Sequence, residues 1–131
     1  MTPWQLCLIG IGGAAGALAR YWLGTWVMGK LPGAGFPWGT FAINVTGSFI
    51  LGLVMTLLTE RVLTSPNWRP LVTIGFVGAY TTFSTFEYET ARLSSSWQAM
   101  ANLLGSVAAG YAAVWAGIKL ALLLSGTAAR G

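Results

Sequence analysis

The sequence predicts an all-α membrane protein in which each subunit has four transmembrane helices and the third helix is broken. Hydrophobic residues make up 55% of the 131 residues and charged residues only 8%, which excludes a soluble domain with a polar surface. Four stretches contain the roughly 20 mostly apolar residues that a helix needs to cross a bilayer. A run of glycines, hydroxyl-bearing residues and aromatics interrupts the third stretch between positions 75 and 86.

The four predicted spans cover residues 4–27, 38–59, 71–91 and 97–124. Short segments that contain Gly, Pro, Ser and charged residues connect them. Tryptophans at positions 4, 26, 38, 68 and 97 lie near the ends of the spans, as the aromatic belts of membrane proteins do. Because no connecting segment is long enough for a soluble domain, residues 1–131 are expected to form a single membrane domain.

The first span is rich in glycine and contains one arginine. Its 10–16 segment comes close to a dinucleotide-binding fingerprint, but neither a second strand nor a downstream acidic partner follows. Gly12 and Gly16 have the spacing that lets two membrane helices approach closely, so we interpret them as packing residues. Arg20 lies about 24 Å beyond Trp4 along a helix, near the opposite interface. Its side chain either snorkels to the headgroups or attracts an anion into a vestibule.

Polar and small residues recur every four positions on one face of the second and fourth spans. They are Asn44, Ser48 and Gly52 in the second span and Asn102, Ser106 and Gly110 in the fourth. Polar side chains are costly in lipid and tend to face a partner or a water path. The two stripes therefore either line one path or join neighbouring helices.

The third span has the composition of a broken helix. Gly75 and Gly78 weaken the helix, and the hydroxyls of Thr81, Thr82 and Ser84 compete for backbone partners. Non-helical backbone at mid-membrane is tolerated only where protein or a water-filled cavity satisfies it, and breaks of this kind build ion sites. The sequence therefore predicts that the chain binds or moves an ion.

Two phenylalanines follow the break on one helical face. Phe83 and Phe86 are three residues apart, and such a pair in a membrane helix ordinarily serves core packing. The edge of an aromatic ring is also the positive end of its quadrupole. Beside hydroxyl donors such as Thr82 and Ser84, these edges suit a small, strongly hydrated anion.

Composition excludes several other chemistries. The chain has no His and a single Cys, Cys7, which rules out a Cys/His zinc site, a His-based triad and a disulfide within the chain. Its net charge of +4 is spread over loops and helix ends without a basic cluster, so no nucleic-acid partner is expected. An enzyme is not expected either, because no nucleophile has an adjacent base.

Three motifs carry a resemblance to a known family. They are Gly-Phe-x-Gly-x-x-Thr-Thr-Phe-Ser-Thr-Phe at 75–86, Gly-Thr-x-x-x-Asn-x-x-Gly-Ser at 39–48 and the glycine-rich first helix that leads to Arg20. Together they resemble the Fluc family of small fluoride channels, also called CrcB, over nearly the whole chain. The resemblance implies passive export of fluoride across the inner (plasma) membrane by an antiparallel homodimer, with two pores along the subunit interface.

The resemblance also implies roles for individual residues. Those expected to line the fluoride pore are Phe83, Phe86, Asn44, Thr82, Ser84, Ser106 and Arg20. Phe83 and Phe86 would form an aromatic box, and Asn44 would supply the pore amide. Thr82 and Ser84 would flank the box.

A structural sodium ion is the cofactor that the resemblance implies. Backbone carbonyls of Gly78 and Thr81 from both subunits would hold it, and it would not be transported. The chain departs from the pattern of many relatives at Ala79, where they have a second Gly, so that Gly78-Ala79-Tyr80 places the bulky Tyr80 near the break. It also has Asn102 where some relatives have Tyr or His.

The rival function is a small dual-topology exporter that couples drug efflux to proton entry. Its chemistry needs a mid-membrane carboxylate that alternates between a proton and a cation. The only acids within the predicted spans are Glu87 and Glu89, toward the end of the third span. These acids either titrate or reach the interface. A structural membrane adaptor would not explain the broken helix.

The distribution of basic residues predicts insertion in both orientations. One side of the membrane would hold Arg61, Arg69, Lys119 and Arg130, and the other Arg20, Lys30 and Arg92. Because an excess of Lys and Arg normally sets orientation, this near balance favours dual topology and an antiparallel homodimer. Two-fold symmetry would then bring the broken third helices together at mid-membrane.

Overall fold

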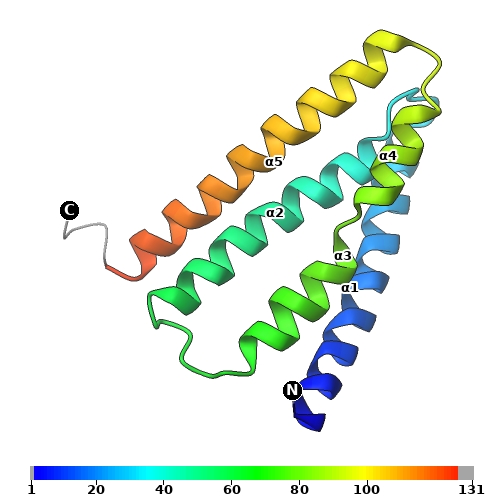
Figure 1. The fold of residues 1–131 in the computed structure, drawn as a ribbon. Helices are drawn as coiled ribbons and strands as arrows, with labels where there is room; N and C mark the ends of the chain where they lie inside the picture. The colour runs from blue at the N-terminus through cyan, green and yellow to red at the C-terminus, as the bar shows by residue number, and fades with distance from the viewer. Residues whose placement is uncertain (1, 127–131) are drawn as a thin grey trace.

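The computed structural model describes residues 2–126, and its regular elements are all helices (Figure 1). In chain order they are α1 (Pro3–Lys30), α2 (Trp38–Thr59), η1 (Arg69–Val77), α3 (Gly78–Tyr80), α4 (Phe83–Ala91) and α5 (Ser96–Leu124). Within this part of the chain, α1, α2 and α5 are long and apolar enough to cross a membrane. The expected helical, multi-pass membrane protein is therefore confirmed. Arg130, one of the basic residues considered for orientation, lies outside the described residues.

The third segment is divided by two extended residues. η1 is a π-helix of nine residues, and α3 adds three residues before the helix ends. Thr81 (φ −77°, ψ 157°) and Thr82 (φ −151°, ψ 117°) are extended, and α4 begins at Phe83. The break lies inside the 75–86 run, where the sequence predicts it. The π-helical form of η1 was not predicted.

Close backbone contact joins the first half of this segment to α1. η1, the green helix before α3 in Figure 1, packs along α1. A Cβ atom at Gly12 would overlap the carbonyl oxygen of Leu71, and one at Gly16 would overlap that of Phe76. The prediction that these glycines allow two helices to approach closely is confirmed.

α5 packs along α2 through the same kind of contact (Figure 1). A Cβ atom at Gly52 would overlap the carbonyl oxygen of Val114, and one at Gly117 would overlap that of Phe49. Gly52, the last member of the polar stripe on α2, therefore serves helix packing.

Few large side chains are buried within the described chain. The buried apolar residues are Leu8, Ile43, Val77, Tyr80, Phe86 and Ala121. Large apolar residues cover much of the outside, for example Ile11 and Leu18 on α1 and Val107 on α5. Because such a surface is unfavourable in water, it suits contact with lipid or with another membrane subunit.

Gly16→Ala tests the backbone contact between α1 and η1. The added methyl group would force the two helices apart at Phe76, so we expect a loss of about 1–3 kcal/mol of stability, the usual cost of overpacking. The measurement is the apparent melting temperature in detergent. Gly10→Ala is the matched control, because nothing lies within 4 Å of a Cβ atom there. Equal melting temperatures for the two variants would contradict the close approach.

Candidate functional site

A cavity of about 290 Å³ lies where α2, α4 and α5 meet the break. Its lining residues are Asn44, Gly47, Ser48, Leu51, Val77, Thr81, Thr82, Phe83, Phe86, Ser106 and Val107. All the residues predicted to line a pore are among them except Ser84 and Arg20. No side chain in this lining is charged.

Asn44 holds the break by pairing with the backbone of Thr82. The Thr82 N–H donates to Asn44 Oδ1 (2.9 Å), and Asn44 Nδ2 donates to the Thr82 carbonyl oxygen (3.0 Å). The carboxamide therefore supplies both hydrogen-bond partners that Thr82 lost by leaving the helix. One N–H of the Asn44 amide is left for another acceptor, because a carboxamide has two donors.

Tyr80 anchors the other side of the break. Its side chain is buried, and its ring stacks on Phe76 with the ring centroids 5.5 Å apart. Its hydroxyl lies 2.7 Å from Thr46 Oγ1. Because the Thr46 hydroxyl donates to the Ala42 carbonyl (2.7 Å), Tyr80 is the donor in this pair. The bulky Tyr80 is thus accommodated at the break, with its polar atom satisfied.

The two phenylalanines both face the cavity but differ in exposure. Their ring centroids are 6.0 Å apart and the rings are tilted by 38°. Phe86 is 7% exposed, whereas Phe83 is 71% exposed. Within one chain, only Phe86 is therefore covered by protein.

The threonine hydroxyls at the break are already engaged in local hydrogen bonds. Thr82 Oγ1 accepts from the Thr85 N–H (3.3 Å) as the N-cap of α4 and donates to Thr85 Oγ1 (2.9 Å). The Thr81 hydroxyl donates to the Val77 carbonyl (2.9 Å). Ser48 lines the cavity, and within residues 2–126 its hydroxyl makes no hydrogen bond.

Ser84 and Arg20 lie outside this cavity. Ser84 is exposed on α4. Arg20 is partly buried on α1, and its guanidinium has no hydrogen bond or ion pair with the described residues. The structure thus brings together five predicted pore residues, Asn44, Thr82, Phe83, Phe86 and Ser106, and leaves these two apart.

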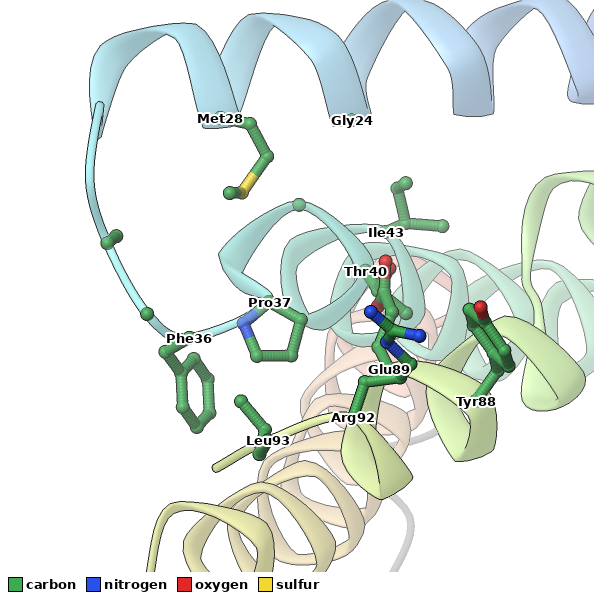
Figure 2. Close-up of a pocket in the computed structure, with 13 residues that line it drawn as sticks. Gly24, Met28, Phe36, Pro37, Thr40, Ile43, Tyr88, Glu89, Arg92 and Leu93 are labelled. Carbon is green, nitrogen blue, oxygen red and sulfur yellow. The ribbon is translucent and has the colours of Figure 1, made fainter. Parts of the chain in front are cut away.

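A second cavity, of about 480 Å³, lies further along α2 and α4 (Figure 2). Thr40 lines it one turn before Asn44, and Glu89 lines it three residues after Phe86. Figure 2 shows Thr40, Glu89 and Arg92 gathered on one side of this cavity. Thr40 was not singled out from the sequence, although the four-residue spacing of the stripe on α2 extends back to it.

The two acids on α4 have different surroundings. Glu89 is partly buried, and its Oε2 atom is buried without a hydrogen-bond partner among the described residues. Glu87 is exposed and borders a third, mainly apolar hollow beside Leu103 and Tyr111. Glu89 therefore faces the second cavity, while Glu87 lies on the outside of the chain.

These features define a class of protein, a small helical membrane protein whose broken helix lines a site suited to an ion. This chain belongs to the CrcB family. Residues 7–118 match the family described as "CrcB-like protein, Camphor Resistance (CrcB)".

Curated relatives align with most of the chain. It is 54% identical over 117 residues to a fluoride-specific ion channel FluC of Solibacter usitatus, in an alignment that covers 87% of this chain and 95% of the relative. The FluC of Acidobacterium capsulatum is 51% identical over 113 residues, with 84% and 90% covered. The FluC of Magnetococcus marinus is 44% identical over 123 residues, with 92% and 99% covered.

Asn44→Leu tests the two hydrogen bonds between Asn44 and the backbone of Thr82 at the break. Leucine has a similar size but leaves the partly buried Thr82 N–H and carbonyl without protein partners, which costs up to about 1–3 kcal/mol for each group. We expect a clear drop in melting temperature and faster hydrogen exchange at the break. Ser48→Ala, one turn further along α2, removes a hydroxyl without a hydrogen bond and serves as the control. If the two variants melt alike, Asn44 does not hold the break.

Proposed function

We propose that this protein is a fluoride-selective ion channel that lets fluoride leave the cytoplasm passively. The observation that carries the proposal is the 290 Å³ cavity, where an amide N–H and two phenylalanine rings meet at a helix break without a charged side chain. Relatives over nearly the full chain length are named fluoride-specific ion channels.

The cavity offers weak anion-binding groups. The free N–H of Asn44 and the hydroxyl of Ser48 are available hydrogen-bond donors, and the ring edges of Phe83 and Phe86 are electropositive. The Ser106 hydroxyl becomes a donor to the cavity only when it turns away from Asn102. Conduction requires binding that is favourable enough for the ion to enter and weak enough for it to leave. An uncharged lining meets both needs, because a buried Lys or Arg would hold the anion too strongly.

The spacing of the two cavities along α2 and α4 suggests a continuous route. Asn44 and Phe86 line the inner one, and Thr40 and Glu89, about one helical turn away, line the outer one. An ion that leaves the aromatic pair would therefore enter the wider cavity at the ends of α1 and α2. Arg92 also lines that cavity.

A proton-coupled exporter is not favoured. That mechanism needs a carboxylate in the central cavity, and the lining of the 290 Å³ cavity contains none. Glu89 lies in the outer cavity instead.

We further propose an antiparallel homodimer in the inner (plasma) membrane. Phe83 lines the inner cavity yet is 71% exposed, so a second copy of the chain would complete the wall that one copy leaves open. The near balance of Lys and Arg between the two sides supports insertion in both orientations. The exposed apolar surface supports contact with a second subunit and with lipid.

A structural sodium ion fits the backbone at the break. The Thr81 carbonyl oxygen accepts no hydrogen bond from residues 2–126, and Gly78 is exposed, with open space where a side chain would be. Unwound backbone carbonyls are typical sodium ligands in membrane proteins. Carbonyls of Gly78 and Thr81 from two copies would hold the ion, which would offset bare backbone dipoles without being carried.

Fluoride efflux from proteoliposomes, followed with a fluoride electrode, tests the function. We expect rapid fluoride efflux and no comparable chloride efflux under the same gradient. Equal rates for the two anions, or uptake of a cationic drug driven by a proton gradient, would reject a fluoride-selective channel.

Phe83→Ile and Phe86→Ile test the aromatic edges. Isoleucine keeps apolar bulk but removes the electropositive edge, so each variant should lose at least about tenfold in fluoride rate, or about 1.4 kcal/mol. The dimer should persist in size-exclusion chromatography. Trp97→Ile, at an exposed residue near the start of α5, is the control. Wild-type rates in both Phe variants would assign these residues to packing alone.

Reporter fusions after residue 126 test the orientation. We expect a periplasmic reporter and a cytoplasmic reporter both to be active in separate fusions, because neither orientation is favoured. Activity of only one reporter would exclude the antiparallel arrangement.

Exchange of sodium for a large organic cation tests the structural ion. The exchange should loosen the dimer and stop fluoride efflux, and the protein in sodium buffer should transport no sodium.

A further inference from the structure

A chain of hydrogen bonds connects a cavity hydroxyl to the backbone of the buried phenylalanine. Ser106 Oγ donates to Asn102 Oδ1 (3.1 Å), and Asn102 Nδ2 donates to Thr90 Oγ1 (2.7 Å). Thr90 Oγ1 donates to the carbonyl oxygen of Phe86 (2.7 Å). Asn102 is thus the middle link between α5 and α4.

The middle of this chain is sealed from the surroundings. Asn102 is 1% exposed, and Thr90 and Phe86 are each 7% exposed. In a medium of low polarity such hydrogen bonds are strong, and a satisfied network fixes its members in place. The carbonyl oxygen of the Asn102 side chain is therefore a strong acceptor for the Ser106 hydroxyl, because no water competes for it.

The Ser106 hydroxyl donates to a residue that does not line the cavity. The only hydrogen of the Ser106 hydroxyl is directed at Asn102, so at rest the cavity faces an oxygen and not a donor. A hydroxyl rotates easily about its C–O bond. An anion in the cavity therefore recruits Ser106 as a donor only by taking its hydrogen from Asn102.

We propose that Asn102 is a positioning residue of the anion path. It competes with the passing anion for the Ser106 hydrogen and thereby keeps binding in the cavity weak enough for fast exit. This inference rests on the proposed fluoride channel. It assigns a use to Asn102, a buried polar residue that does not itself line the cavity.

The competition makes the half-saturating fluoride concentration the informative measurement. Without the rival acceptor, Ser106 is free to donate to fluoride, and the ion binds more tightly and leaves more slowly. One added net hydrogen bond changes an affinity by about fivefold. A residue that only packs α5 against α4 would lower the rate without tightening fluoride binding.

Initial rates of fluoride uptake into proteoliposomes, measured at graded fluoride concentrations, test the proposal. Asn102→Leu, which has a similar size and no polar atoms, should lower the half-saturating concentration by about fivefold and also lower the maximal rate. Met100→Leu, at an exposed residue two positions earlier, is the control and should behave as wild type. An unchanged or higher half-saturating concentration would overturn the proposal.

A Ser106→Ala background separates the competition from packing. There the Asn102→Leu substitution should no longer shift the half-saturating concentration, because the contested hydrogen is gone. A shift of the same size in both backgrounds would overturn the proposal. If Asn102→Leu fails to form a dimer, Asn102→Ala replaces it: it also removes the acceptor of Ser106 and should likewise lower the half-saturating concentration. Absence of fluoride uptake in the wild type would instead reject the function itself.

Discussion

The pairing of Asn44 with the backbone of Thr82 is the interaction on which the rest of the site depends. A chain that leaves the helix inside a membrane exposes an N–H and a carbonyl where no water can satisfy them. Here a single carboxamide, 38 residues away in sequence, satisfies both. Because this bond fixes the extended residues, α4 begins at a defined place, and the positions of both phenylalanines follow from it.

The two halves of the third segment are held in different ways. η1 lies against α1 through backbone contacts that Gly12 and Gly16 permit. α4 has only nine residues, too few for an isolated helix to be stable, and side-chain hydrogen bonds fix it at both ends. Asn44 holds its start and Asn102 holds its last turn through Thr90.

The features that the sequence made predictable are those with local causes. The break lies among glycines and threonines whose own chemistry disfavours a helix, so its place between positions 75 and 86 followed from composition. The four-residue spacing of Asn44 and Ser48 put both on the face that lines the cavity. The close contact of Gly12 and Gly16 with another helix followed from their spacing, although the partner helix did not.

The remaining features arise from contacts between distant segments. Neither the partner of Asn44 nor that of Asn102 is visible in a local pattern, and the outward direction of Ser84 depends on where α4 starts.

One mechanical consequence follows from the way the third segment is fixed. Its first half packs against α1 through backbone contacts, whereas its second half is held by the amide groups of Asn44, on α2, and Asn102, on α5. The two phenylalanines are therefore anchored to α2 and α5 and not to α1. A displacement of α1 in the bilayer is separated from the aromatic pair by the Asn44 pairing at Thr82.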